Sequence, residues 1–90
     1  MYYTYVLFSK KDRRLYVGCT SDLKRRLHEH KSGKSIATKN RLPLILIHYE
    51  AYMRQTDAKR REKYLKGGNG RAQLKIQLQA VLEELGYKHL

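Results

Sequence analysis

Two strand-like segments separated by a short polar turn occupy the first twenty residues, and they constrain the fold more than any other feature. The segment YYTYVLFS, Tyr2–Ser9, is rich in tyrosine and β-branched residues, which favour strands. The polar turn KKDR follows, and RLYVGCT, Arg14–Thr20, has the same strand character. Because two strands joined by so short a turn pair most simply as an antiparallel hairpin, the sequence predicts a sheet that begins with this hairpin.

Three helices are predicted from capping residues and apolar spacing. Ser21 and Thr56 are suitable N-caps, because their hydroxyls can accept a hydrogen bond from a first-turn amide. They precede helices over Asp22–Lys31 and Asp57–Lys66, and the second of these is expected to stop at the sequence GGNG. Ala72–Leu85 carries leucine and valine at helical spacing, which predicts a third helix.

A third strand is predicted between the first two helices, where Pro43 introduces LILIHYEAY, Leu44–Tyr52. The predicted order is therefore β-β-α-β-α-α. The chain shows no internal repeat, linker or low-complexity tract. We expect one α+β domain over residues 1–90.

The chain is strongly basic: 20 Lys and Arg against 8 Asp and Glu give a net charge of +12, spread over the whole length. Such a charge favours polyanions as partners, of which nucleic acid is the commonest. Cys19 is the sole cysteine, which excludes an internal disulfide and the usual zinc sites and fits a reducing cytosol. No segment approaches the roughly 20 apolar residues of a membrane span, so a cytoplasmic protein without membrane association is expected.

The first predicted helix directs two unusual side chains toward the sheet. At about 100° per residue, Leu23 and Leu27 define its inward face, and Arg26 and His30 flank this stripe. Their neighbours point to water: Lys24, Arg25 and His28. An inward histidine is usually a satisfied core residue. An inward arginine beside it, with no acid nearby in sequence to pair with it, favours a site that handles phosphate instead.

The second predicted helix has an inward acid. Ala58 and Leu65 mark its inward face, and Glu62 projects between them. A buried carboxylate requires a partner, because leaving it unpaired costs several kcal/mol. An ion pair with Arg61 or Arg26 is one interpretation, and a ligand for a hard divalent cation is the other.

Glycine interrupts the second predicted strand. Tyr16 and Gly18 share one face of it, because side chains alternate along a strand. A glycine in a strand often marks a place where another group approaches the backbone closely. We therefore expect Gly18 to clear space beside the Tyr16 hydroxyl. Tyr3 and Tyr5 likewise share one face of the first strand, although tyrosine is also common in strand packing.

These residues form an ordered set. The triplets YTY and YVG are followed by Arg26, ten residues after the second-triplet tyrosine, by His30 four later, and by Glu62 within AKRREKYLKGGNGR. The set resembles the GIY-YIG nuclease superfamily, most closely its small stand-alone bacterial members, although YTY lacks the name-giving glycine. The resemblance spans about residues 2–82 and implies a small three-stranded antiparallel sheet flanked by helices.

The resemblance also implies an activity: divalent-metal-dependent hydrolysis of DNA phosphodiester bonds by an endonuclease, with repair and recombination among the open roles. Glu62 would bind Mg²⁺ or Mn²⁺, and Arg26 would donate hydrogen bonds to the phosphate. Tyr5 or Tyr16 would accept the proton of the attacking water, and His30 would take it onward. The sequence does not choose between the two tyrosines.

Further residues are expected to support this site. Gly18 would be structural, and Asn69 is a candidate for an asparagine that some family members carry. Flanking phosphates of the DNA, whether duplex, branched or single-stranded, would be gripped by basic residues of the hairpin tip, the outer helix face and the following loop. These are Lys10, Lys11, Arg13, Arg14, Lys24, Arg25, Lys39 and Arg41.

Two other functions stay open. A nucleic-acid-binding module on the same fold, with little or no nuclease activity, would bind DNA without cutting it. A basic ribosome-associated protein would prefer structured RNA and would respond to divalent ions only through screening. Gly18 and Glu62 have no role in that last account.

Overall fold

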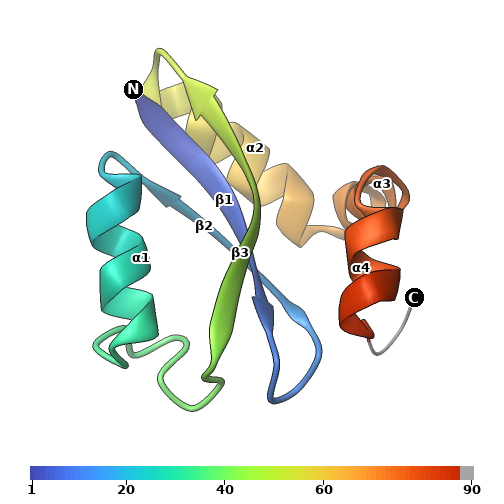
Figure 1. The fold of residues 1–90 in the computed structure, drawn as a ribbon. Helices are drawn as coiled ribbons and strands as arrows, with labels where there is room; N and C mark the ends of the chain where they lie inside the picture. The colour runs from blue at the N-terminus through green and yellow to red at the C-terminus, as the bar shows by residue number, and fades with distance from the viewer. Residues whose placement is uncertain (88–90) are drawn as a thin grey trace.

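A computed structural model describes residues 1–87 of the chain. Within this range it has three strands and four helices in the order β-β-α-β-α-α-α, which confirms the α+β fold and adds one helix to the prediction (Figure 1). None of these helices is long and apolar enough to cross a membrane. The elements are β1 (Tyr2–Ser9), β2 (Leu15–Thr20), α1 (Leu23–Lys31), β3 (Leu44–Tyr52), α2 (Gln55–Lys66), α3 (Gly68–Gln77) and α4 (Gln79–Leu85).

The sheet is antiparallel, with β1 between the two edge strands in the order β2-β1-β3. The predicted hairpin is confirmed: Tyr5 lies opposite Gly18, and Leu7 lies opposite Tyr16. Because β1 has a neighbour on each side and helices above and below, residues 4–9 are all buried.

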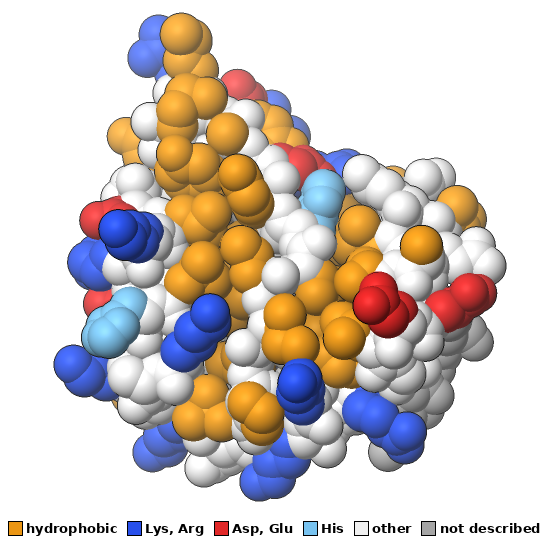
Figure 2. Space-filling model, viewed as in Figure 1, with side chains coloured by type: hydrophobic (Ala, Val, Ile, Leu, Met, Phe, Trp, Pro, Cys, Tyr) orange, Lys and Arg blue, Asp and Glu red, His pale blue; other side chains and the backbone are white. Residues whose placement is uncertain are grey.

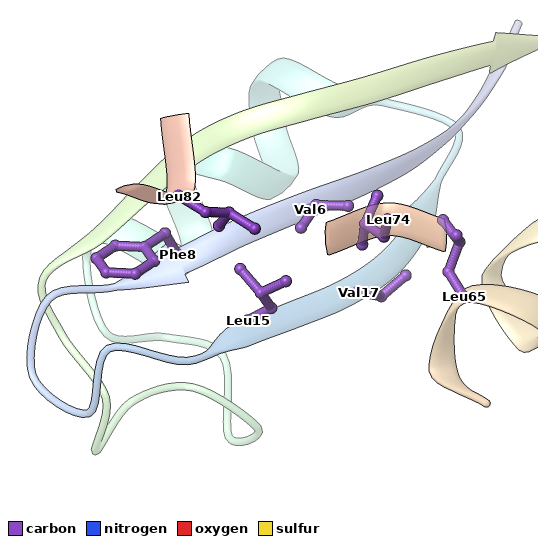
Figure 3. Packing of buried hydrophobic residues seen from close by; sticks show 7 residues of the cluster. All are labelled: Val6, Phe8, Leu15, Val17, Leu65, Leu74 and Leu82. Atoms are coloured by element: carbon purple, nitrogen blue, oxygen red, sulfur yellow. The ribbon is translucent and has the colours of Figure 1, made fainter. Parts of the chain in front are cut away.

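Different helices cover the two faces of the sheet (Figure 1). On one face, side chains from α2, α3 and α4 pack on the strands in a core shown in Figure 3, formed by Val6, Phe8, Leu15, Val17, Leu65, Leu74 and Leu82. On the other face, a smaller core joins the sheet to α1 and contains Tyr5 and Leu7. Side chains alternate along a strand, so successive residues of β1 face opposite helix layers.

The first helix starts later than predicted. α1 begins at Leu23, and its N-cap is Asp22, whose carboxylate accepts a hydrogen bond from the Arg25 amide at 3.0 Å. The prediction of Ser21 as the cap was wrong. The amide of Asp22 donates to Thr20 Oγ1 at 3.1 Å, which holds the backbone of Asp22 extended and delays the first helical turn by one residue.

The second helix starts earlier than predicted. α2 begins at Gln55, and Arg54 occupies the cap position with an extended backbone and no side-chain hydrogen bond to the helix. Thr56 was therefore a wrong prediction for the cap. It lies inside the first turn together with Asp57, whose negative charge is favourable at a helix N-terminus.

The GGNG sequence ends α2, as predicted, but it also begins α3 instead of forming a loop. Gly70 is buried where α3 crosses the end of α2. A Cβ at this position would lie 2.5 Å from the carbonyl carbon of Tyr64 and 2.9 Å from the Cα of Leu65. Glycine allows the two helix backbones to approach this closely. The single helix predicted over 72–85 is also divided, since α3 and α4 meet at Leu78.

Candidate active site

Four residues singled out from the sequence meet between α1 and the sheet. Tyr5 comes from β1, Tyr16 from β2, and Arg26 and His30 from α1. The Tyr5 hydroxyl and His30 Nε2 form a buried hydrogen bond of 2.8 Å. The centroid of the His30 ring lies 5.7 Å from that of Tyr5 and 5.3 Å from that of Tyr16, in edge-to-face geometry. We call these four residues the tyrosine–histidine cluster.

Gly18 makes room for this cluster, although not for the side chain we expected. A Cβ on Gly18 would lie 2.5 Å from Cζ of Tyr5, and closer still to the Tyr5 hydroxyl oxygen. The three atoms nearest to that position all belong to Tyr5, so the expectation that Gly18 clears space beside Tyr16 was wrong. The reason is the register: Tyr5 lies directly opposite Gly18 on the neighbouring strand, whereas Tyr16 lies opposite Leu7.

Arg26 lies at the rim of the cluster, with 29% of its side chain exposed. Its Nη1 donates to Glu29 Oε1 at 3.0 Å, its Nη2 donates to Ser35 Oγ at 3.3 Å, and the guanidinium also hydrogen-bonds to Tyr5. The expectation that no nearby acid would pair with Arg26 was wrong, because Glu29 is one helical turn away. The guanidinium is thus held in place, partly exposed, beside the two tyrosines.

Burial controls the protonation of the cluster. It raises the pKa of Tyr5 to about 12; the hydrogen bond from Arg26 opposes this shift, and charge on Tyr16 and on Glu62 adds to it. Burial, together with the positive charge of Arg26, lowers the pKa of His30 to about 4, and the charge of Glu29 opposes this shift. At neutral pH the His30 ring is therefore uncharged, with Nε2 bonded to Tyr5 and Nδ1 bonded to Thr38 Oγ1 at 2.6 Å.

The two tyrosines are not equivalent. Tyr5 is 1% exposed, on the central strand, and its hydroxyl is occupied by His30. Tyr16 is only partly buried and belongs to the edge strand β2. Water or a phosphate ester can therefore reach the Tyr16 side chain more readily than that of Tyr5.

Glu62 belongs to α2, which covers the opposite face of the sheet. Its side chain is 23% exposed, and Oε2 accepts a hydrogen bond from Lys66 Nζ at 3.0 Å. Neither predicted ion pair is formed, since Arg61 binds Glu50 at 2.9 Å and Arg26 binds Glu29. The Glu62 charge nevertheless acts on Tyr5, contributing to its raised pKa. The carboxylate is thus within electrostatic reach of the tyrosine–histidine cluster across the sheet.

The pKa of Cys19 shows which part of the sheet the Glu62 charge reaches. After burial, the Glu62 charge is the next cause that raises the pKa of the Cys19 thiol. α2 contacts β2, and Cys19 is the residue of β2 next to Gly18, so the Glu62 charge acts on the stretch of this edge strand that carries Gly18. A further link comes from Thr4, whose hydroxyl donates to the Ala58 carbonyl of α2 at 2.7 Å and fixes this helix to β1.

The chemistry of Glu62 fits a hard divalent cation. In residues 1–87, no three His, Cys, Asp or Glu side chains gather into a group that could hold a metal ion. An ion at Glu62 would therefore have fewer than three such side chains of the described residues as ligands. Mg²⁺ is commonly bound by one or two carboxylates, with waters and substrate phosphates completing its shell. The pair with Lys66 would have to open, which is a small cost for a partly exposed i,i+4 pair.

Most of the basic residues expected to contact DNA lie on the surface: Lys10, Lys11, Arg13, Arg14, Lys24, Arg25 and Lys39. Arg41 differs, because it is half-buried and its Nε donates to Asp12 Oδ2 at 2.6 Å. Figure 2 shows that the positive side chains are not uniform on the face drawn, where a band of apolar side chains runs down the middle and Lys and Arg gather mainly below and beside it.

Two loop residues that support the cluster were not predicted from the sequence. Thr38 and Ser35 are buried in the segment after α1, which the sequence suggested was only a polar loop. Thr38 holds His30, and Ser35 contacts Arg26. Hydroxyl residues in a polar loop are normally exposed, so no local signal marked them. Asn69 is exposed in the first turn of α3.

Comparisons with known proteins identify one family for this chain. A model of the GIY-YIG catalytic domain matches residues 1–75. A UPF0213 protein of Streptococcus agalactiae serotype V is 41% identical over 73 residues, which are 80% of this chain and 82% of that protein. A UPF0213 protein of Staphylococcus haemolyticus is 33% identical over 76 residues, 83% of this chain and 92% of that protein. No solved structure matches the chain significantly.

The family match includes both tyrosine triplets, α1 and α2, so it covers every residue of the tyrosine–histidine cluster and Glu62. The relatives match over most of their own length. The chain therefore belongs to the GIY-YIG family, a nuclease family, and is similar to its small UPF0213 members.

Proposed function

We propose that the chain is a divalent-metal-dependent endonuclease that hydrolyses DNA phosphodiester bonds. The proposal rests on the tyrosine–histidine cluster, which brings a fixed, partly exposed guanidinium beside two tyrosines. Hydrolysis of a phosphate ester needs a cationic donor for the phosphate oxygens and an acceptor for the proton of the attacking water. The cluster has a residue for each task. Membership of a nuclease family supports the same reaction.

Arg26 is proposed to donate hydrogen bonds to the non-bridging phosphate oxygens, as negative charge builds on them. Tyr16 is proposed to accept the proton of the attacking water, because it is the more accessible tyrosine. The neutral His30 holds the Tyr16 ring in position through an edge-to-face contact, and Tyr5 packs against the same ring in a tilted arrangement.

Glu62 is proposed to hold Mg²⁺ or Mn²⁺. Such an ion, when bound, supplies positive charge that neutralises the scissile phosphate and stabilises the leaving 3′ oxygen. The location of Glu62 beside the edge strand supports this role, because a phosphate at Tyr16 is then approached from both sides of that strand.

Nicking of supercoiled plasmid, with Mg²⁺ or Mn²⁺ and with EDTA, tests the proposal. The parent is expected to nick only with a divalent ion. Arg26→Gln should lower the rate by about 10²–10³-fold, the usual effect of removing a donor that stabilises the transition state. Arg60→Gln is the matched control, because Arg60 is 73% exposed on α2 and is not among the residues expected to contact DNA. It should nick at nearly the parental rate.

The same assay separates the alternatives. The net charge of +12 favours polyanion binding whether or not the chain cuts. DNA retarded in a gel but never nicked by the parent, with either ion, would support a binding module without nuclease activity. Preference for structured RNA with no specific effect of divalent ions would support a ribosome-associated protein. Parental nicking by Arg26→Gln would remove the assigned role of Arg26. A function in cytoplasmic DNA repair or recombination would follow from structure-specific nicking.

A further inference from the structure

A positively charged cavity of about 540 Å³ lies at the hairpin end of the sheet. Two of its lining residues, Leu15 and Tyr87, also belong to the packing on the face covered by α2, α3 and α4. It is therefore separate from the tyrosine–histidine cluster, which lies under α1. The lining combines segments far apart in the sequence: Asp12, Arg14, Leu15, Arg41, Arg71 and Tyr87.

Internal hydrogen bonds fix Arg41 and Arg71 in this cavity. Arg41 donates from Nε and Nη2 to both carboxylate oxygens of Asp12, at 2.6 and 3.3 Å, and its carbonyl accepts a 2.6 Å hydrogen bond from Ser9 Oγ. Arg71 donates from Nε to the Leu65 carbonyl at 3.3 Å, which leaves its two terminal nitrogens as further donors. Arginines held in this way lose less conformational freedom on binding than extended surface lysines.

The charge of the lining is strongly unbalanced. Three guanidinium groups surround one carboxylate. The hydrogen bonds from Arg41 hold the pKa of Asp12 below its usual range, so this carboxylate is ionised and engaged with Arg41 at neutral pH. Among residues 1–87 the Arg71 guanidinium has no carboxylate partner, so its charge suits an anion, and the planar, forked guanidinium suits phosphate oxygens in particular.

The cavity is close to the candidate active site along the edge strand. Arg14 precedes Tyr16 by two residues, and two residues of a strand span about 7 Å. Successive phosphates of one DNA strand advance about 3.4 Å along the helix axis. A polynucleotide with one phosphate beside Tyr16 therefore has neighbouring phosphates within reach of the cavity.

We propose that this cavity binds a phosphate group, and that in the substrate this group is a backbone phosphate flanking the scissile one. Only the second part rests on the proposed function. Arg71 is the new contact, since nothing in the sequence set it apart. Gly70 and the close crossing of α2 and α3 bring Arg71 from a distant helix to the tip of the hairpin.

Salt dependence of DNA binding tests the proposal, measured by fluorescence anisotropy with a labelled duplex in EDTA, so that no cleavage occurs. Arg71→Gln should reduce the slope of log K against log salt by about 0.9, the value for one lost duplex phosphate contact. Arg54→Gln is the matched control, because Arg54 is exposed beyond β3, at the opposite end of the sheet from the hairpin tip. Its slope should fall less than that of Arg71→Gln.

Arg71 also donates a hydrogen bond to the Leu65 carbonyl, so its substitution could destabilise the fold. Thermal unfolding is therefore measured first, to show that the variant is folded. If Arg71→Gln does not fold, Arg14→Gln replaces it. A parental slope in the folded variant would overturn the proposal. A titration with inorganic phosphate, followed by NMR, distinguishes a free phosphate ligand from a DNA backbone phosphate. Saturable chemical-shift changes in the hairpin turn and α3, together with an unchanged slope for DNA binding, would mean that the ligand is free phosphate. That result would overturn the assignment to the DNA backbone. Failure of Arg26→Gln to lose nicking would leave this binding result unaffected, so the two proposals fail separately.

Discussion

Substitution of Gly18 by alanine tests how the structure couples stability to the candidate site. The new Cβ would lie 2.5 Å from Cζ of Tyr5, well inside the van der Waals distance. The Tyr5 ring cannot yield easily, because it is 1% exposed and hydrogen-bonded to His30 at 2.8 Å. Either the ring or the β1–β2 pairing must therefore shift.

The free energy of unfolding should fall by an amount that follows from two contributions. Inserting a methyl group into a packed core costs about 1–3 kcal/mol. Separating Tyr5 from His30 leaves buried polar groups without partners and costs about 1–3 kcal/mol more. We expect a total loss of about 3 kcal/mol. In a domain of this size, each kcal/mol lowers the melting temperature by about 4–8 °C.

Urea denaturation followed by circular dichroism measures this loss. The matched control is Gly68→Ala, because a Cβ on Gly68 meets no atom within 4 Å. Alanine in that helical position should leave stability unchanged or raise it by up to about 1 kcal/mol. A Gly18→Ala variant as stable as the parent would refute the packing described for Tyr5, Gly18 and His30.

Three further predictions concern stability. The pKa of His30 is about 4 in the folded protein, against 6.5 for an ordinary histidine. Between pH 6.5 and pH 4 the unfolded chain therefore binds a proton that the folded protein does not bind. The free energy of unfolding should fall as the pH falls through this range. The slope should approach about 1.4 kcal/mol per pH unit, and urea titrations of His30→Gln should lack it. Thr38→Val removes the partner of His30 Nδ1 and should cost about 1–3 kcal/mol in the same assay; a parental value would mean that this bond contributes nothing. Gly70→Ala should destabilise by at least about 1–3 kcal/mol, because its Cβ would meet the backbone of Tyr64; a melting temperature equal to that of Gly68→Ala would contradict the close helix crossing.

Local patterns in the sequence predicted most of the fold. The three strands match within one residue, because tyrosine and β-branched runs bounded by turns are strong signals. The inward direction of Arg26 and His30 followed from helical spacing alone, and His30 is indeed buried. The pairing of Arg26 with Glu29 was missed, although i,i+3 spacing on a helix indicates it.

Features that depend on contacts between distant segments could not be predicted in this way. Gly70 looked like part of a loop, because only the packing of α3 on α2 shows why a glycine is required. Thr38 became a partner of His30 through the path of a loop that has no repeating pattern. Gly18 was correctly identified as making space, but the side chain that fills it depends on strand register, which a single strand does not reveal.

Crystals soaked in Mn²⁺ would test the central claim most directly, namely that Glu62 of α2 and the tyrosine–histidine cluster under α1 serve one metal-dependent site. Anomalous scattering locates the ion without any assumption about activity. We expect a Mn²⁺ ion on the Glu62 carboxylate, facing Tyr16 and Arg26, with Lys66 displaced from its present pair. Glu62 still bonded to Lys66, with Mn²⁺ bound elsewhere or nowhere, would contradict it.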